Sequence, residues 1–269
     1  MTTMRPFTQL DVFTDVPLKG NALAVVHDAE GLSDAQMRDF ARWTNLSETT
    51  FLLAPTDPAA DYRVRIFTTA RELPFAGHPT LGSCHAWLAA GGRPKKAAQV
   101  IQECGVGLVR VRRDAEQIAF AAPPLIRSGP VDETTLAHIA RALRIQPDAI
   151  RASQWVDNGP GWVAVMLASR DEVLALQPDY AAMLPLEIGV VAPCPIGHDA
   201  QFEVRAFIPG GGPNEDPVTG SLNASLAQWL IGSGLAPPRY VAAQGTALGR
   251  AGRVFIERSD DAIWVGGGC

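Results

Sequence analysis

The sequence predicts a mixed α/β (α+β) fold in two pseudo-symmetric halves, each a β-barrel-like sheet wrapped around one central apolar helix. The first observation behind this prediction is a stretch that occurs twice, over residues 62–91 and again over residues 202–231. Each copy opens with an alternating run, Val64-Arg65-Ile66-Phe67 or Val204-Arg205-Ala206-Phe207, and passes through a Gly/Pro-rich loop into an apolar segment. Internal similarity at so long a period indicates two structurally equivalent halves.

The second observation is that both apolar segments lack charge. No charged residue lies between Pro79 and Gly91, or between Pro217 and Gly234. A helix that is apolar on every side must be buried on every side, and proline suits the first turn of a helix. We therefore expect one buried helix to begin near each proline. The free N–H groups and the dipole of such a start suit an anion, although Gly-Pro loops also lead into ordinary helices.

Aligning the two copies on these prolines places one titratable residue at the same point of each. His78-Pro79 then matches Asp216-Pro217, and Gly82-Ser83 matches Gly220-Ser221. This alignment predicts that both helix starts face a single cleft, suited to a small carboxylate.

Composition limits the class of protein. The chain has 269 residues, of which 47% are hydrophobic and only 19% charged, with a net charge of −5. These values fit two domains, extensive burial and a subunit interface, and they disfavour nucleic-acid binding. We expect a cytoplasmic protein without membrane contact, since no signal peptide or membrane-length apolar run is evident. The four scattered cysteines are expected to be free thiols.

In the first half, alternating or apolar runs predict strands, and turn residues separate them. The expected strands are 7–14, 22–27, 49–53, 98–103, 106–111 and 117–121, besides the strand that opens the repeat. A helix over 34–43 is expected because Ser33 can cap it and Met37, Phe40 and Ala41 recur at helical spacing.

The second half repeats this plan. Asp132 is expected to cap a helix that reaches Leu143, and a short helix is expected within 177–183. The expected strands are 155–157, 162–168, 188–192, 240–243, 253–257 and 262–265. Pro123-Pro124 suggests halves of 1–122 and 123–259, with the last strand, about 260–269, returning to the first half.

Three ionisable residues stand out as candidates for catalysis. Glu48 lies at the mouth of an apolar strand, whereas His78 and Asp216 lie at the two expected helix starts. Each also has an ordinary explanation: a solvated link residue, a loop histidine bonded to backbone, and a helix-capping aspartate. A metal site is not expected, because His78 and His85 have no third ligand at a useful spacing.

At these residues the sequence resembles the phenazine-biosynthesis isomerase family, called PhzF-like, which has the fold of diaminopimelate epimerase. The matching segments spread across most of the chain. They are DVFT…GNALAVV (11–26), NLSETTFL (45–52), RIFTTARELPFAGHPTLG (65–82), NGPGW (158–162) and EDPVTGS (215–221).

The resemblance implies an active site between the halves, without cofactor or metal, in a homodimer. It implies catalytic roles for Glu48, His78 and Asp216. It also implies substrate contacts from a second set of residues: Gly77, Gly220, Ser221 and Asn21. The related epimerases use one cysteine at each helix start, but Ala76-Gly77 and Asp216-Pro217 contain no thiol.

The expected function is that of a cofactor-independent isomerase. It would shift a proton on a small carboxylate-bearing substrate by acid–base catalysis in the cleft between the halves. Two alternatives remain open: an epimerase or racemase of an amino acid, and a non-catalytic small-molecule-binding homologue. The resemblance names phenazine biosynthesis but does not identify the substrate or the pathway.

Overall fold

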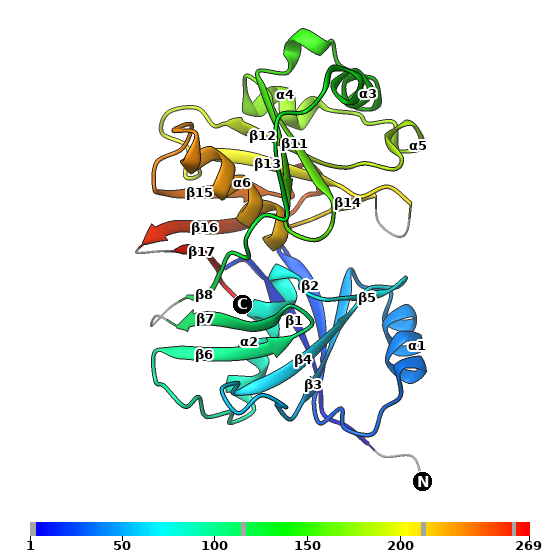
Figure 1. Ribbon diagram of the computed structural model, residues 1–269, viewed down its shortest axis with the longest axis vertical. Coiled ribbons are helices and arrows are strands. Elements are labelled where there is room, and N and C mark those ends of the chain that lie inside the picture. The colour runs from blue at the N-terminus through cyan, green and yellow to red at the C-terminus, as the bar shows by residue number, and fades with distance from the viewer. Residues whose placement is uncertain (1–3, 114–116, 211–213, 260–261) are drawn as a thin grey trace. The chain divides into compact units, whose positions relative to one another are not determined.

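The computed structural model describes residues 4–113, 117–210, 214–259 and 262–269, and its chain divides into two halves (Figure 1). The N-terminal half comprises Met1–Ala121 with Gly266–Cys269, and the C-terminal half comprises Ala122–Val265. Residues 260 and 261, where the returning segment was expected to begin, lie outside the described residues, as do residues 211–213 of the glycine-rich loop. Within the N-terminal half, the Phe13 amide donates to the Gly268 carbonyl oxygen at 2.7 Å.

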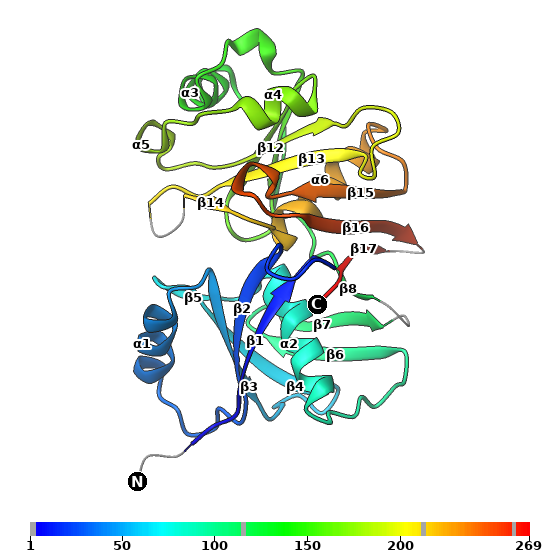
Figure 2. The same ribbon diagram turned by 180° about the vertical axis from the view of Figure 1, so that it is seen from behind.

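The N-terminal half is a curved sheet with one helix on each face (Figures 1 and 2). Its strands pair in the order β1-β2-β3-β4-β6-β7-β8, parallel at β2–β3 and β4–β6 and antiparallel elsewhere, with β5 paired to the end of β4. Helix α1 packs on β3 and β4, whereas α2 contacts β1, β2, β3, β6 and β8. The elements are β1 Phe7–Val12, β2 Asn21–Val26, α1 Asp34–Thr44, β3 Glu48–Leu53, β4 Tyr62–Phe67, β5 Glu72–Leu73, α2 Gly77–Ala89, β6 Gln99–Cys104, β7 Gly107–Arg113 and β8 Ile118–Ala121.

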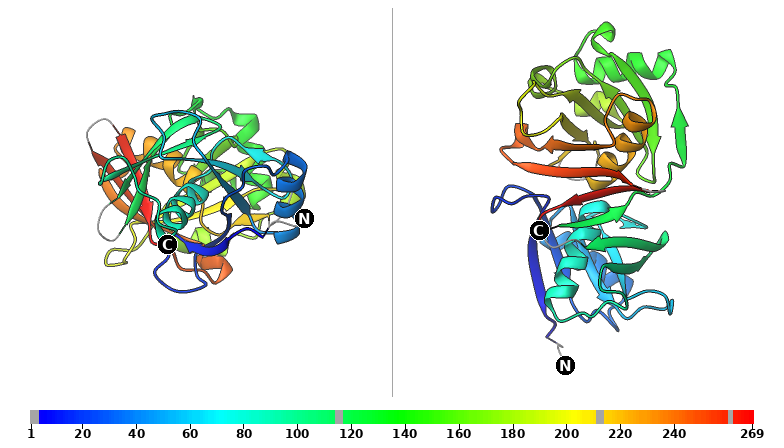
Figure 3. Two further views of the ribbon diagram at one scale, coloured as in Figure 1. Left: turned by 90° about the horizontal axis from the view of Figure 1, so that it is seen from below. Right: turned by 90° about the vertical axis from the view of Figure 1, so that its left-hand side faces the viewer.

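The C-terminal half repeats this topology. Strands β10-β11-β12-β13-β15-β16 pair in the same order and with the same directions as β1-β2-β3-β4-β6-β7, and β9 adds to β10. Figure 3 shows α6 enclosed by the strands of this half, where it contacts β10 and β16. The elements are β9 Arg127–Gly129, α3 Glu133–Leu143, β10 Ala152–Asp157, β11 Trp162–Met166, α4 Arg170–Ala175, α5 Tyr180–Met183, β12 Glu187–Pro193, β13 Phe202–Phe207, β14 Glu215–Asp216, α6 Gly220–Gly232, β15 Arg239–Gln244, β16 Gly252–Ser259 and β17 Ala262–Gly267; single 3₁₀ turns are Pro147–Ala149 and Thr246–Leu248.

The shared topology confirms the predicted α/β fold in two pseudo-symmetric halves, each built around one uncharged helix. Helix α6 is buried along almost its whole length. Helix α2 is fully buried only in its first two turns, and its far end is half-exposed. There, Trp87 stacks on Tyr62 with a ring separation of 5.2 Å. The expectation that both helices are buried on every side therefore holds for α6 and for the start of α2.

The alignment of the two copies on their prolines is wrong. In the structure, α2 begins at Gly77 and contains Pro79 in its first turn, but α6 begins at Gly220, three residues after Pro217. The strand register gives the correct alignment: Leu73 pairs with Ile66 as Asp216 pairs with Ala206.

Asp216 therefore matches Leu73 and lies in a short strand before the helix. The second residue of α6 is Ser221, and this is the true counterpart of His78. The error arose because the loop before α6 is longer than the sequence pattern suggests, so that matching prolines do not occupy matching places.

Each half contains a bidentate Arg–Glu pair at the same point, between the repeat's opening strand and the short strand that follows. Arg65 donates from Nε and Nη2 to the two carboxylate oxygens of Glu72, at 2.7 and 2.6 Å. Arg205 does the same to Glu215, at 2.8 and 2.7 Å. The first pair is half-exposed and the second is buried.

The remaining nitrogen of each arginine binds a helix on the outer face of the sheet. Arg65 Nη1 donates to Asp34 in the first turn of α1, at 2.7 Å. Arg205 Nη1 donates to the carbonyl oxygens of Val173 and Leu176 at the end of α4, at 3.1 and 2.9 Å. In both halves, one guanidinium therefore links the repeat's opening strand, the short strand paired with it and a helix.

We expect Glu215→Gln to lower the free energy of unfolding by about 3 kcal/mol or more, because it leaves the buried Arg205 without a counter-charge. The matched control is Glu72→Gln at the same point of the other half, where solvent screens the arginine and the loss is about 1 kcal/mol or less. Urea unfolding of both variants measures the difference. Equal losses would contradict the structural role assigned to the buried pair.

Candidate active site

Glu48 and His78 meet at the start of the central helix of the N-terminal half. Glu48 is the first residue of β3, and its Oε2 lies 3.3 Å from Nε2 of His78, the second residue of α2. Side chains alternate along a strand, so Glu48 lies on the same face of β3 as Thr50, which contacts Ser83 of α2. The His78 side chain is 3% exposed and that of Glu48 is 15% exposed. Glu48 is therefore not a solvated link residue.

Asn21 contacts the other nitrogen of the His78 ring. Its Nδ2 lies 3.2 Å from His78 Nδ1, and both side chains are buried. Asn21 begins β2, directly after a tight turn at Gly20. The Asp11 carboxylate accepts from the amides of Lys19 and Gly20, each at 2.9 Å. A Cβ on Gly20 would lie only 2.2 Å from the Val12 carbonyl oxygen, so the turn requires glycine there.

Burial determines the charge of His78. Removal from water lowers the pKa of the His78 imidazole to about 3, and a backbone hydrogen bond with Ala22 only partly opposes this shift. The ring is therefore neutral near pH 7. The 3.3 Å contact is accordingly a contact between a neutral ring and a carboxyl group, and not an ion pair.

Both central helices begin without a side-chain cap. Ala76 precedes α2 and Thr219 precedes α6, and neither side chain accepts a hydrogen bond from the first turn. The other α-helices of the described chain are capped by Ser33, Asp132, Ser169 and Asp179. Because the first N–H groups of a helix lack partners within it, these two starts are left without the side-chain acceptor that the other helices have.

Ser221, at the start of α6, accepts hydrogen bonds from two residues: Asn158 in the loop before β11 and Trp162 at the start of β11. Trp162 Nε1 donates to Ser221 Oγ at 3.2 Å, and Asn158 Nδ2 donates to the Ser221 carbonyl oxygen at 3.0 Å. Gly220 and Ser221 are both buried. The motif NGPGW was noticed in the sequence, but the roles of Asn158 and Trp162 were missed, since the residues they contact lie about sixty positions further along.

Asp216 lies beside this helix start. Its Oδ2 accepts from the Thr219 hydroxyl at 2.6 Å, and its carbonyl oxygen accepts from Gln244 Nε2 at 3.1 Å. Asp216 is thus fixed by Thr219, the residue that occupies the N-cap position itself. The sequence carried no signal for the roles of Thr219 or Gln244.

The structure groups the predicted site residues by half. In the N-terminal half, Asn21, Glu48 and His78 are in contact, and Gly77 is the buried first residue of α2. In the C-terminal half, Asp216, Gly220 and Ser221 surround the start of α6.

Thiols and metal ligands do not gather at either helix start. Cys84 lies well inside α2, and burial raises the pKa of its thiol to about 12. Among the described residues, no cluster of three His, Cys, Asp or Glu side chains has the geometry to bind a metal. No helix in the described part of the chain combines the length and apolarity needed to cross a membrane.

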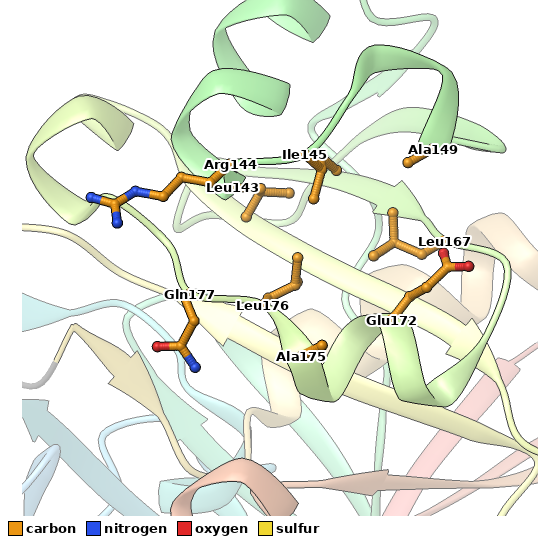
Figure 4. Close-up of a pocket in the computed structure, with 9 residues that line it drawn as sticks. All are labelled: Leu143, Arg144, Ile145, Ala149, Leu167, Glu172, Ala175, Leu176 and Gln177. Atoms are coloured by element: carbon orange, nitrogen blue, oxygen red, sulfur yellow. The ribbon is translucent and has the colours of Figure 1, made fainter.

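One pocket of about 300 Å³ lies elsewhere in the C-terminal half, around α3 and α4 (Figure 4). None of the residues that line it is a catalytic or substrate-binding candidate. Figure 4 shows the Arg144 guanidinium directed away from the apolar lining. Its Nη2 pairs with the Asp179 carboxylate at 3.2 Å. The lining residues are Leu143, Arg144, Ile145, Ala149, Leu167, Glu172, Ala175, Leu176 and Gln177.

We expect His78 to make stability depend on pH. The unfolded histidine has a pKa near 6.5, whereas the folded one has a pKa of about 3. As the pH falls from 6.5 toward 3, the unfolded chain binds a proton that the folded chain refuses, so the free energy of unfolding falls by up to about 1.4 kcal/mol per pH unit. Unfolding of wild type and His78→Asn across this range measures the effect. Identical pH dependence in both proteins would contradict it.

Comparison with known proteins agrees with this architecture. The family model described as phenazine biosynthesis-like protein, PhzC-PhzF, matches residues 10–267. A fission-yeast (Schizosaccharomyces pombe) protein named antisense-enhancing sequence 1 is 37% identical, with 98% of this chain and 96% of that protein covered. A trans-2,3-dihydro-3-hydroxyanthranilate isomerase of Pseudomonas fluorescens is 34% identical, with 94% and 90% covered.

Solved structures give the same result. A PhzF-family protein from Enterococcus faecalis has a TM-score of 0.80 and 25% identity, with 98% of this chain and 95% of that chain covered. A protein described as a predicted epimerase from Pseudomonas aeruginosa has a TM-score of 0.78 and 28% identity, with 98% and 96% covered. A hydroxyproline epimerase from Agrobacterium vitis, at 13% identity, a TM-score of 0.54 and coverage of 96% and 87%, shares the fold alone. The chain therefore belongs to the phenazine biosynthesis-like (PhzF) family and is an isomerase.

Proposed function

We propose that this isomerase moves a proton between carbons of a small carboxylate-bearing substrate, without a cofactor, and that Glu48 carries the proton. The observation that supports this most strongly is the contact of Glu48 with a neutral, buried His78 at an uncapped helix start. A carbon-bound proton is weakly acidic, so its base must be close, correctly aimed and shielded from water. Glu48 is mostly buried, and one of its oxygens lies 3.3 Å from His78 Nε2.

The state of His78 distinguishes the two candidates for the base. An imidazole with a pKa of about 3 accepts protons poorly near pH 7. His78 is therefore the orienting residue, and Glu48 is the residue that accepts and returns the proton.

The start of α6 is the proposed site for the substrate carboxylate. Its N–H groups at Gly220 and Ser221 and the positive end of its dipole favour an anion. Trp162 Nε1 donates to the Ser221 hydroxyl oxygen, so the hydroxyl proton remains available to donate to a substrate oxygen. We propose Asp216 and Gly77 as further substrate contacts.

The named relatives suggest a substrate class. Relatives named for the isomerisation of trans-2,3-dihydro-3-hydroxyanthranilate match across most of the chain, at 34% and 32% identity. That name describes a ring carboxylate with amino and hydroxyl groups, so cyclic amino carboxylates are the first compounds to test.

An epimerase is the second candidate, supported by the structural match to the protein described as a predicted epimerase. It would need a second acid–base residue on the opposite face of the reacting carbon, and the described cysteines do not supply one at either helix start. Product stereochemistry separates the two reactions. A protein that only binds its ligand would give no solvent-deuterium exchange into the compound.

We expect Glu48→Gln to reduce turnover by about a thousandfold while substrate affinity stays within about tenfold, because glutamine keeps the size of glutamate but cannot exchange a proton. The measurement is the incorporation of solvent deuterium into a cyclic amino carboxylate, with binding followed by calorimetry. Exchange that persists in the variant would show that another residue is the base, and equal losses of affinity and turnover would indicate a binding role.

We expect Ser221→Ala to raise KM by about tenfold with little change in kcat, since it removes one hydrogen bond to a charged group that persists throughout the reaction. Ser225→Ala is the matched control: Ser225 lies in the same helix, is equally buried, and its hydroxyl has no partner among the described residues. Similar KM values for both variants would exclude Ser221 from carboxylate binding.

A further inference from the structure

A buried glutamine in the C-terminal half makes four hydrogen bonds around the start of α6. Gln244 is the last residue of β15, and its side chain is fully buried. Its Oε1 accepts from the Thr219 amide at 3.0 Å and from Asn223 Nδ2 at 2.8 Å. Its Nε2 donates to the Asp216 carbonyl oxygen at 3.1 Å and to Thr219 Oγ1 at 2.9 Å. The side-chain amide thus uses both of its N–H groups and both acceptor positions of its oxygen.

The types of atoms in these bonds fix the direction of each one. A backbone N–H can only donate and a carbonyl oxygen can only accept, so the Gln244 amide has a single orientation. Because Gln244 Nε2 donates to Thr219 Oγ1, the one hydroxyl proton of Thr219 is directed elsewhere. It is donated to Asp216 Oδ2 at 2.6 Å, a length typical of a bond from a hydroxyl to a carboxylate.

Gln244 also takes the place of a local capping residue. In a capping box, a Glu or Gln three residues into the helix accepts from the amide of the N-cap residue. In α6 the N-cap is Thr219 and the residue three positions on is Leu222, so the acceptor comes from Gln244 of β15 instead. This bond uses the Thr219 amide and neither of the N–H groups of Gly220 and Ser221, which are proposed to bind the substrate carboxylate.

Two glycines let β15 and β16 approach the loop before α6 closely. Gly245 directly follows Gln244, and a Cβ there would lie 2.6 Å from the Pro217 carbonyl oxygen. Gly252 pairs with Gln244, and a Cβ there would lie 2.4 Å from Val218 Cγ2. Glycine at such positions marks a close approach of two segments of backbone. The position of the Gln244 amide is therefore set by the packing of the strand against this loop.

We propose that Gln244 is a positioning residue that acts on Asp216 through Thr219. Because Gln244 donates to the Thr219 hydroxyl oxygen, the hydroxyl proton is left to hold Asp216 Oδ2 beside the start of α6. Asp216 is thereby fixed at two points, its carbonyl oxygen by Gln244 and its carboxylate by Thr219. This inference rests on the proposed contact of Asp216 with the substrate.

The first measurement needs no substrate. Amide hydrogen exchange, followed by NMR, compares wild type with Gln244→Met, which keeps the length of the side chain but forms none of the four bonds. We expect the Thr219 amide to exchange about tenfold faster in the variant, relative to the Leu226 amide within α6, because its acceptor is lost.

The matched control is Gln102→Met in the N-terminal half. Gln102 is equally buried, and its Nε2 donates to Thr80 Oγ1 of α2 at 3.0 Å. This variant also removes a buried glutamine that joins a strand to a central helix. The Thr219 amide should exchange in it as in wild type.

The second measurement is deuterium exchange into a cyclic amino carboxylate. Thr219→Val removes the hydroxyl and keeps the shape of the side chain. We expect Thr219→Val and Gln244→Met each to lower kcat/KM by about tenfold. The double variant should lie within about twofold of either one, because both changes act through the same hydroxyl. Thr219→Ser keeps a hydroxyl and should stay within about threefold of wild type.

The Asp216→Ala background separates a positioning role from a merely structural one. If Gln244 acts through Asp216, Gln244→Met should lower kcat/KM no further in this background, whereas a general loss of structure would lower it by the same factor as before. If Gln244→Met does not fold, Gln244→Glu takes its place. Its carboxylate accepts from the Thr219 amide but cannot donate to the hydroxyl, so it should keep that amide protected and lose as much activity as Thr219→Val.

Three results would overturn the proposal: unchanged exchange of the Thr219 amide in Gln244→Met, additive losses from Gln244→Met and Thr219→Val, or an undiminished effect of Gln244→Met in the Asp216→Ala background. Failure of the proposed substrate contact is distinguishable. Asp216→Ala would then keep the kcat/KM of wild type, whereas the Thr219 amide would still respond to Gln244→Met.

Discussion

The burial of two uncharged helices is the constraint on which the rest of this structure depends. Helices α2 and α6 carry no charged side chain, so each half closes its strands around one of them. That burial also encloses the helix starts, where four N–H groups have no partner within the helix. The chain caps its peripheral helices with Ser or Asp but leaves these two starts uncapped. The two helices that build the core are thus also the ones whose starts are proposed to meet the substrate.

The two halves keep one scaffold and differ in the side chains that it presents. Strand order, direction and the Arg–Glu pair recur, with Arg65–Glu72 in one half and Arg205–Glu215 in the other. The second residue of the central helix does not recur: it is His78 in α2 and Ser221 in α6. A duplicated backbone therefore positions a histidine beside Glu48 in one half and a serine hydroxyl that accepts from Trp162 in the other.

Local signals in the sequence predicted most of the helices and strands, but they could not predict contacts between residues that are far apart in the sequence. Ser33 and Asp132 cap their helices as expected, because a cap depends on residues three positions apart. Helix α4 was missed, since six residues give too little periodicity. The predicted match of Asp216 with His78 was wrong because the loop before α6 is longer than the sequence pattern suggests. Only the pairing of β13 with β14 reveals this. The contact of Glu48 with His78 depends on how β3 packs against α2, and no spacing in the sequence encodes it.

The partners of two glutamates explain why one is structural and the other is proposed to react. Glu215 is bound bidentately by Arg205, so both of its carboxylate oxygens already accept from a guanidinium. A carboxylate held in this way is a poor carrier of protons. Glu48 instead lies 3.3 Å from an imidazole that burial keeps neutral, so this neighbour brings no positive charge. A cationic histidine at position 78 would favour the ionised form of Glu48 and would weaken it as a base. The depth at which His78 is buried thus bears on the proposed chemistry, because it keeps the ring beside Glu48 uncharged.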